Sequence, residues 1–589
     1  MTWTRYFNIL NFPCRCPLEK NHSNNSKKIL YLRYLQFLFN YQPVRGYVHS
    51  GTKIEPDDHH KVINFDTMLK IRRDEARRSI LVQVQSEQSC PDVHNYCLQF
   101  GQIKNLYFYS HQETSHFTLI EFPEASCVDK VLQECGHIDL SRVIPVRSPF
   151  LWFRSGMKNT STNIRNNKSS VNCKKGKTKP RNNELIEWLM QAETISDQML
   201  ILYKSTCLDD LAIRLRFLTA RQVEASITGL FPVNKCLLFG SSVNGFGILG
   251  CDLDLFINFD DSGQESYKKR LVFHTKSSLL NNRTQVQKHL EALADHFQLF
   301  HPGCTSVKRI FQAKVPIMKY RQELTGIDCD LSISSMTAIY MSELLYTFGN
   351  IDWRIRPLMF TIKKWAAEVK LTNPNPGRYI TNFSISLLVI FYLQQIKILP
   401  SLDELIKKSG VDDKRLSDDG VNCTFLRDVT SFQRHPRDKD LSLEDLLQGF
   451  FEYYASFDFN MKAIALGCGG PLPKQDYAPL YIINPLERHL NVSKNVSAEE
   501  TERLKIELRN AMWELELSSK SEENNREGVW GLMRLFQGNN YSKREKDLFS
   551  LTRKTVLLNS EMSAINKNEK LNSSIESQTN TTTLKGRRR

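Results

Sequence analysis

The fold of this chain is decided by the stretch Leu238-Phe239-Gly240-Ser241-Ser242-Val243-Asn244-Gly245-Phe246-Gly247-Ile248-Leu249-Gly250-Cys251-Asp252-Leu253-Asp254-Leu255. It predicts a buried strand, a Gly-Ser turn, a short helix and a second strand that carries Asp252 and Asp254. Side chains two residues apart on a strand point to the same face, so both carboxylates can reach one divalent cation. Two like charges this close are costly unless a cation lies between them. The pattern therefore indicates a metal site.

The Gly-Ser turn adds a candidate phosphate site beside these carboxylates. Gly240 lets the backbone approach a phosphate closely, and the helix that begins at the turn with Ser241 points its amide groups toward it. A phosphate cradle next to paired metal carboxylates is the arrangement that nucleotidyl transfer requires. For an isolated Asp-x-Asp, the alternative is a solvated strand end without a catalytic role.

The order Gly-Ser, ten further residues and Asp-x-Asp resembles the signature of the DNA polymerase β-like nucleotidyltransferase superfamily. The family's third carboxylate lies on a neighbouring strand, and the strand-like segment Gly326-Ile327-Asp328-Cys329-Asp330-Leu331-Ser332-Ile333 supplies it here. Asp330 is the predicted ligand because it stands between hydrophobic residues as in the family, while Asp328 faces the same side and is the alternative. The resemblance implies that Asp252, Asp254 and Asp330 bind two Mg²⁺ or Mn²⁺ ions, and that Asp330 takes the proton of an attacking 3′-hydroxyl.

Later segments resemble the helical central domain of the noncanonical poly(A) and poly(U) polymerases. They comprise residues 342–346, 354–358, 362–366 and 380–394. The resemblance implies that Lys363 contacts the triphosphate. It also places Asn382 and Phe383, at the family's Ser-Tyr position, beside the base, with Phe383 stacking on it. The family's second phosphate lysine is Ala367 in this chain. Two nearby residues are candidates to replace it, Lys364 and Lys370.

The segment Pro479-Leu480-Tyr481-Ile482-Ile483-Asn484-Pro485-Leu486-Glu487-Arg488-His489-Leu490-Asn491-Val492-Ser493 is similar to the nucleotide-recognition loop of the same polymerases. The resemblance implies nucleotide contacts by Glu487, Leu490 and Asn491. Members that prefer UTP often place a His directly before the Asn-Val pair, where it crowds out a purine. This chain has Leu490 there, with His489 one position earlier. One steric obstacle is worth about 1–3 kcal/mol, so the loop favours ATP without excluding UTP.

The amino acids at several motif positions resemble those of the mitochondrial branch of these poly(A) polymerases. The shared segments are 240–244, 249–254, 342–346, 381–384, 422–425 and 491–497. Cys251, where most relatives carry Ser, points to the same branch, and the resemblance covers residues 184–515. It implies a template-independent RNA 3′ adenylyltransferase that uses ATP on the 3′ ends of mitochondrial RNA. The alternatives are a terminal uridylyltransferase and a non-catalytic RNA-binding relative.

The N-terminal residues 1–50 read as a leader. They contain seven Lys or Arg and a single acidic residue, Glu19. Residues 31–39 can form an amphipathic helix, and this profile predicts a mitochondrial transit peptide and a matrix location. The alternative is a basic arm that binds nucleic acid. The longest apolar run is too short and interrupted for a membrane-spanning segment.

Residues 78–154 predict a second α/β unit. The expected strands and helices, in the order strand, helix, strand, strand, helix, strand, are 80–84, 92–100, 105–109, 116–122, 125–135 and 143–154. This is the order of an RNA-recognition motif. Its aromatic residues nominated for base stacking are Tyr107, Tyr109, Phe117 and Phe122. The alternative is a core or interface role, because the RNP1 signature is absent. The mitochondrial family uses such a domain to dimerise, which implies a homodimer.

The remaining chain predicts an α+β catalytic core of two lobes. A nucleotidyltransferase palm with a mixed sheet is expected at 231–335, and a helical central domain at 184–230 and 336–515. Residues 155–183 carry eight basic and no acidic residues and read as a flexible linker. Residues 519–589 read as a mostly disordered basic tail, in which 529–536 can dock.

Charge and cysteine content agree with this interpretation. The net charge of +15 and the pI near 9.1 suit a polyanionic partner such as RNA. The 14 cysteines are scattered without a Cys-x-x-Cys pair, which predicts reduced thiols and no structural zinc.

Overall fold

The computed structural model describes residues 63–111, 115–136, 147–153, 173–232, 234–259, 282–313, 315–333, 336–417, 419–429, 441–520 and 530–536. The predicted transit peptide at 1–50, most of the predicted linker and nearly all of the predicted tail lie outside these residues. Among the described helices, none is both long and apolar enough to cross a membrane.

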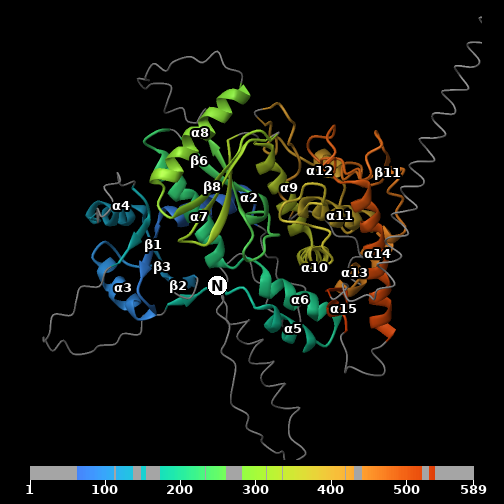
Figure 1. Cartoon of the computed structure of the whole chain (residues 1–589), viewed down its shortest axis with the longest axis horizontal. Helices are drawn as coiled ribbons and strands as arrows, with labels where there is room; N and C mark the ends of the chain where they lie inside the picture. The colour runs from blue at the N-terminus through green and yellow to red at the C-terminus, as the bar shows by residue number, and fades with distance from the viewer. Residues whose placement is uncertain are drawn as a thin grey trace, which may run out of the picture. The chain divides into compact units, whose positions relative to one another are not determined.

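The first sheet carries helices on one face (Figure 1). Its elements are β1 Ser79–Val84, η1 Glu87–Ser89, α3 Cys90–Leu98, β2 Asn105–His111, β3 Ser115–Glu121, α4 Ala125–Glu134, β4 Phe150–Trp152 and β5 Lys174–Lys175, in the strand order β4-β1-β3-β2-β5. Residues of α3 and α4 share a core with Ile80, Ile120 and Phe122. The described part of the predicted last strand at 143–154 is β4, which pairs in parallel with β1. Hydrogen bonds from the Leu81 N–H to the Pro149 carbonyl oxygen and from the Phe153 N–H to the Gln83 carbonyl oxygen, both at 2.9 Å, continue this pairing on either side.

The opposite face of this sheet is also buried. Tyr107 Oη donates a hydrogen bond to Asp210 Oδ2 at 2.7 Å, and Tyr109 Oη donates one to the Leu324 carbonyl oxygen at 2.9 Å. Phe117 is only 2% exposed. These aromatic side chains therefore serve as interface and, with Phe122, as core. The expectation that they stack on RNA bases is wrong for this arrangement, because other parts of the chain already cover them.

The predicted linker is partly regular structure. Residues 174 and 175 form β5, which pairs in parallel with β2, and the Lys177 N–H donates to Asp209 Oδ2 at 2.7 Å. The expectation of flexibility through 183 is therefore wrong for the described end of the segment. Backbone pairing and a carboxylate partner fix this end, which composition alone does not reveal.

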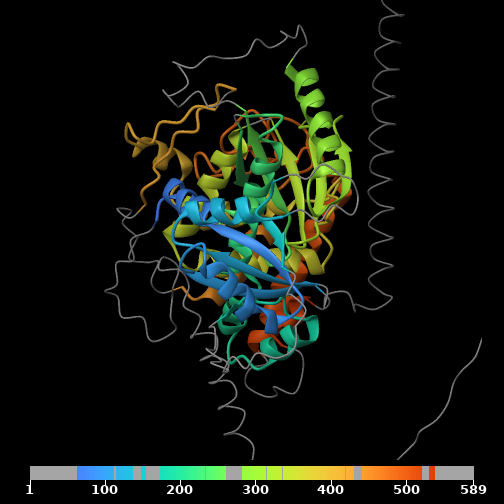
Figure 2. The same ribbon diagram turned by 90° about the vertical axis from the view of Figure 1, so that its left-hand side faces the viewer.

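The second sheet is the palm. Its elements are β6 Lys235–Phe239, η2 Gly240–Ser242, β7 Leu253–Asn258, α8 Asn282–Phe300, β8 Cys304–Ile310, β9 Ile317–Gln322 and β10 Ile327–Ser332, in the strand order β6-β7-β10-β9-β8. β7 and β10 are parallel and the other pairs are antiparallel, so the sheet is mixed as predicted. α8 lies along β8, as Figures 1 and 2 both show.

Helix α7, Asp210–Ile227, packs against β6 and against α2, Phe65–Arg77. It therefore accompanies the palm sheet, whereas residues 184–230 were expected to join the helical lobe. The reason is that α7 is buried around most of its circumference, between the sheet on one side and α2 on another. Such a helix has no single apolar stripe that would reveal its partner.

The helical lobe surrounds a large apolar core. Its elements are α5 Asn182–Met190, α6 Ile195–Thr206, α9 Thr337–Ile351, α10 Ile355–Glu368, α11 Asn382–Gln395, α12 Leu402–Lys407, α13 Leu443–Ala455, α14 Ala498–Lys520 and α15 Leu532–Phe536, with the small hairpin of β11 Lys462–Ala463 and β12 Leu472–Pro473. α11 lies at its centre, since every residue from Ser384 to Gln394 is buried. Leu532 and Leu535 of α15 enter the same core, so the predicted docking of 529–536 is confirmed for these residues.

Candidate active site

The three predicted aspartates lie on neighbouring strands of the palm. Asp252 directly precedes β7, Asp254 lies on it, and Asp330 pairs with Asp254 in the parallel register between β10 and β7. Adjacent strands are about 4.8 Å apart, so the carboxylates leave the sheet at one place on the same face. Leu253, Cys329 and Leu331 point the other way and are buried.

The register also separates Asp330 from its alternative, Asp328. Both Oδ atoms of Asp328 accept hydrogen bonds from Arg321 Nη1 at 3.0 Å, and the Asp328 side chain is 59% exposed. Asp330 is less exposed and stands beside Asp254. The geometry therefore favours Asp330 as the third member of the cluster.

The turn after β6 lies against Asp254. Gly240 has a φ of +69°, and a Cβ on it would lie 2.2 Å from Asp254 Oδ2, so only glycine fits. The Gly240 N–H donates to Ser342 Oγ at 2.7 Å, and that hydroxyl donates to the Ala338 carbonyl oxygen at 2.8 Å. Helix α9 thus fixes the turn that carries Ser241. Ser342 lies inside a motif noted in the sequence, but only the folded contact reveals this positioning role.

The negative charge of the cluster is incompletely compensated. Burial and the nearby charges of Asp330 and Asp252 raise the pKa of Asp254 to about 7. Burial and Asp330 likewise raise the pKa of Asp252, while the Lys319 ammonium acts in the opposite direction on both carboxyls. Ionisable groups with pKa values shifted this way are typical of functional sites.

The donor set suits a divalent ion. Carboxylate oxygens are the ligands that Mg²⁺ and Mn²⁺ prefer. The raised pKa of Asp254 reflects uncompensated negative charge, which a bound cation would neutralise. Among the described residues, however, no three His, Cys, Asp or Glu side chains are already gathered around one point. Asp254 packs on Gly240, while Asp330 Oδ2 lies 2.5 Å from Lys319 Nζ. The carboxylates therefore suit such an ion by their chemistry and their register, and in this structure Asp330 is paired with Lys319.

Lys363, on α10, lies beside Phe246 of the same loop. Its Nζ is 5.6 Å from the centre of the Phe246 ring, and burial lowers the pKa of Lys363 to about 8. The two candidates for a second phosphate lysine are less suitably placed. Lys364 pairs with Glu368 on its own helix at 2.5 Å, and Lys370 follows the end of α10 with a φ of +59°.

The residues predicted to contact the base lie in the helical lobe. Asn382 begins α11 and is exposed, and Phe383 is partly buried against the helical core. The N-cap of this helix is Thr381, whose Oγ1 accepts a hydrogen bond from the Ser384 N–H at 3.0 Å. The helix start is therefore fixed, and it presents the Asn382 side chain to solvent.

The recognition loop is held together by its own polar groups. Asn491 Oδ1 accepts from the N–H groups of Ile482 at 3.1 Å and Ser493 at 2.9 Å, and Asn491 Nδ2 donates to the Leu480 carbonyl oxygen at 3.0 Å. Asn491 therefore shapes the loop. The two other predicted contact residues share a backbone hydrogen bond, since the N–H of Leu490 donates to the carbonyl oxygen of Glu487 at 2.8 Å.

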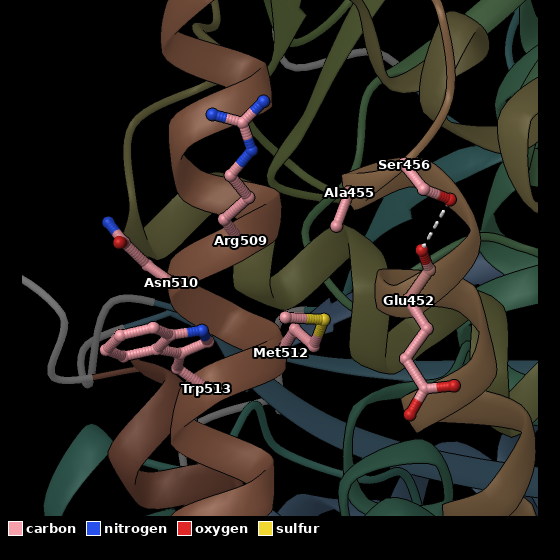
Figure 3. A pocket seen from close by; sticks show the side chains of 7 residues that line it. All are labelled: Glu452, Ala455, Ser456, Arg509, Asn510, Met512 and Trp513. Atoms are coloured by element: carbon pink, nitrogen blue, oxygen red, sulfur yellow. Dashed lines mark hydrogen bonds between the residues drawn. The ribbon is translucent and has the colours of Figure 1, made fainter.

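A separate hollow lies between α13 and α14 (Figure 3). Its volume is about 440 Å³, and its lining includes Glu452, Arg509, Met512 and the exposed Trp513. None of the predicted site residues lines it. The predicted phosphate and metal residues meet instead at the β6–β7 turn and β10, and the predicted base contacts stay within the helical lobe.

Comparisons with known proteins agree with this layout. The family "Poly(A) RNA polymerase, mitochondrial-like, central palm domain" matches residues 195–350, and "Cid1 family poly A polymerase" matches residues 442–492. The mitochondrial poly(A) RNA polymerase of Drosophila melanogaster is 44% identical over 494 residues, covering 80% of each chain. The human enzyme of the same name is 34% identical over 519 residues, covering 84% of this chain and 86% of its own.

A solved structure extends the match to three dimensions. The crystal structure of mtPAP in complex with ATPγS superposes with a TM-score of 0.72 at 32% identity, covering 80% of this chain and 99% of that one. The structure of mtPAP in complex with UTP gives a TM-score of 0.73 at 33% identity, with 80% and 99% covered. The motifs, the fold and the length of the match all agree, and the chain belongs to the mitochondrial poly(A) RNA polymerase family.

Proposed function

We propose that this chain is a template-independent RNA 3′ adenylyltransferase, which adds AMP from ATP to the 3′ ends of mitochondrial RNA. The observation that carries the proposal is the register that sets Asp330 beside Asp254, next to the glycine turn that Asp254 contacts. The Drosophila and human relatives, matched over 80% and 86% of their own length, are named poly(A) RNA polymerases, which argues against the uridylyltransferase alternative. Leu490 in place of a His leaves room for adenine.

The chemistry divides among a few side chains. Asp252, Asp254 and Asp330 would hold two Mg²⁺ or Mn²⁺ ions. When bound, such ions activate the 3′-hydroxyl and stabilise the leaving pyrophosphate. The Asp330 carboxylate accepts the proton of the 3′-hydroxyl, whose oxygen attacks the α-phosphorus of ATP. Two groups hold the triphosphate, Ser241 at the turn and Lys363 from α10.

The base is selected from the helical lobe. Phe383 stacks on adenine and Asn382 lies beside it, while Glu487 and Leu490 line the recognition loop that Asn491 shapes. Relatives have been solved with UTP, GTP and CTP as well as with ATPγS, so binding alone does not reveal the preferred nucleotide. Incorporation into RNA is therefore the proper readout.

We further propose that the N-terminal sheet is an RNA-recognition-motif-like domain that serves in assembly. Its strand order β4-β1-β3-β2, with α3 and α4 on one face, supports that assignment. Because its other face is buried against the catalytic part, that face is not free to stack on RNA bases. We propose a homodimer contact for this domain on the family resemblance alone. Light scattering of the full chain should give twice the mass of 68.3 kDa. A single-chain mass would exclude the dimer.

We further propose a domain division that the packing of α7 on β6 supports. The helical domain takes residues 184–209 and 336–515, and the palm takes 210–335, with α7 moved to it from the expected boundary at 230.

The leader at 1–50 is proposed to direct the chain to the mitochondrial matrix. Fusing residues 1–50 to a fluorescent protein tests this: matrix import is expected, and a cytosolic signal would contradict it.

The activity is tested with the purified full chain, a short labelled RNA and each nucleoside triphosphate separately. ATP should give the longest extension, and Asp254→Asn should give none. Extension with UTP matching or exceeding that with ATP would favour the uridylyltransferase, and the absence of extension with any nucleotide would favour the non-catalytic relative.

A further inference from the structure

The hairpin of β9 and β10 carries two ion pairs side by side. In its antiparallel register Lys319 stands opposite Asp330, and Arg321 stands opposite Asp328. Lys319 Nζ lies 2.5 Å from Asp330 Oδ2, and Arg321 binds both oxygens of Asp328 at 3.0 Å. The pairs occupy equivalent places in the strand register, but only the Lys319 pair includes a residue of the acidic cluster.

The Lys319 ammonium also acts on the rest of the cluster. It lowers the pKa of Asp252 and of Asp254, against the raising effects of burial and of the neighbouring carboxylates. The other charges facing these groups are Asp328 and Arg216, which act on Asp252. Lys319 is thus the cation whose charge reaches all three carboxylates in the described part of the chain.

We propose that Lys319 is a built-in counter-cation of the acidic cluster, which holds Asp330 in the metal-free chain and releases it when a divalent ion binds. This inference rests on the proposed function. In the described residues the register sets Asp330 beside Asp254, and the Asp330 carboxylate is paired with Lys319.

The chemistry of lysine suits such a role. Its ammonium is a compact, strongly hydrated charge on a flexible four-carbon stem, so it can leave a carboxylate without rearranging the backbone. The Lys319 side chain is 38% exposed, which gives the ammonium a path into solvent. An arginine would bind the carboxylate through a rigid fork and would release it less readily. A divalent ion carries twice the charge of the ammonium that it displaces.

The inference predicts competition between the lysine and the metal. Removing the lysine charge removes a competitor and a repelling cation, so Lys319→Gln should bind Mn²⁺ on the order of tenfold more tightly than the natural chain. Lys319→Arg should bind it no more tightly than the natural chain. Arg321→Gln, the matched change in the neighbouring pair, should stay within about twofold, because its partner Asp328 lies outside the proposed metal ligands and is 59% exposed, where solvent and salt screen its charge.

The experiment measures Mn²⁺ binding to the full chain by the electron paramagnetic resonance signal of free Mn²⁺, without ATP or RNA. Circular dichroism first confirms that each variant is folded. If Lys319→Gln does not fold, Lys319→Arg still tests the inference. Tighter binding by Lys319→Gln alone supports the inference. Binding unchanged or weakened in Lys319→Gln would overturn it, as would tighter binding by Lys319→Arg.

A second comparison separates this inference from the proposed function. In an Asp330→Asn background, Lys319→Gln should no longer change the Mn²⁺ affinity, because the carboxylate for which lysine and metal compete is gone. A persistent tenfold gain there would overturn the inference. If the natural chain binds no Mn²⁺ that Asp254→Asn removes, the proposed metal-dependent function fails instead.

Discussion

Charged side chains cluster at two places in this chain, and the pKa values of their carboxyl groups shift in opposite directions. At the interface of the N-terminal sheet with α7, Arg214 pairs with Glu75, Asp210 and Glu121 at 2.7–3.0 Å. The net effect of burial and these partners lowers the pKa of Asp210 and of Glu121. On the palm face, the carboxylates outnumber their cations, and the pKa of Asp254 is raised.

The difference separates buried carboxylates with a structural role from those with a functional one. Carboxylates whose charge is matched within the chain join parts of the structure together. Carboxylates that are left partly unmatched are poised for a ligand that brings the missing charge. The first kind should matter for stability and the second for chemistry, and substitutions can test each assignment.

The largest effect is expected from Asp254→Asn. The loss of one metal ligand should reduce RNA extension on the order of a thousandfold or more. The same substitution should not destabilise the metal-free chain at pH 7.5, because it removes repulsion within the cluster. Primer extension and thermal unfolding measure the two halves. A loss of stability together with activity would make Asp254 a structural residue and would break the comparison.

The reverse pattern is expected at the interface. Arg214→Leu leaves three buried carboxylates without their shared partner, which should cost about 3–5 kcal/mol of unfolding free energy. Denaturant unfolding measures the cost. The control is Arg309→Leu, which breaks an exposed pair with Asp295 and should cost less than about 1 kcal/mol. Equal losses in both variants would show that the buried network has no special role.

Lys363 offers a smaller effect, on substrate binding. Because burial lowers its pKa to about 8, the free enzyme loses this positive charge as the pH rises above 8. The Kd for ATP should therefore rise up to about fivefold between pH 8 and pH 9. Lys363→Arg stays charged and should abolish that dependence, whereas Lys364→Arg should leave it. Isothermal titration calorimetry measures it, and a flat profile for the natural chain would contradict it.

The smallest effect is a difference in the pH dependence of stability. The folded-state pKa of Asp254 is raised from 3.8 to about 7, so the metal-free folded chain binds a proton that the unfolded chain does not. Stability should therefore increase as the pH falls from about 8 to about 5, and Asp254→Asn should lack this increase. Asp210, whose pKa is lowered, contributes stability above its unfolded pKa and loses it only in stronger acid. Thermal unfolding across this range measures the slopes, and equal slopes would refute the assignment.

The sequence predicts what depends on neighbours along the chain. The glycine turn and the pair Asp252 and Asp254 follow from local spacing. Asp330 needed a family resemblance to distinguish it from Asp328, because both face the same side of one strand. The local sequence does not predict the role of Lys319, because that role depends on the hairpin register. The Glu323-Leu324-Thr325-Gly326 turn between the strands is a signal from which the register could be predicted.

Other features could not be predicted from local patterns. α7 has buried residues around its circumference, so its sequence does not reveal that it packs on the palm. The aromatic residues on the N-terminal sheet look alike in sequence whether RNA or protein covers them, and their contacts in the folded chain, such as that of Tyr107 with Asp210, decide between these possibilities. The tertiary partner, which the local sequence does not contain, makes the difference in each case.

The most direct measurement compares Asp330→Asn with Asp328→Asn in extension of a labelled RNA by ATP. These residues are two positions apart on one strand, each with a cation opposite it. Loss of extension in Asp330→Asn, with Asp328→Asn retaining most of it, is the predicted result. Full extension by Asp330→Asn, or loss confined to Asp328→Asn, would contradict a catalytic site built from Asp252, Asp254 and Asp330.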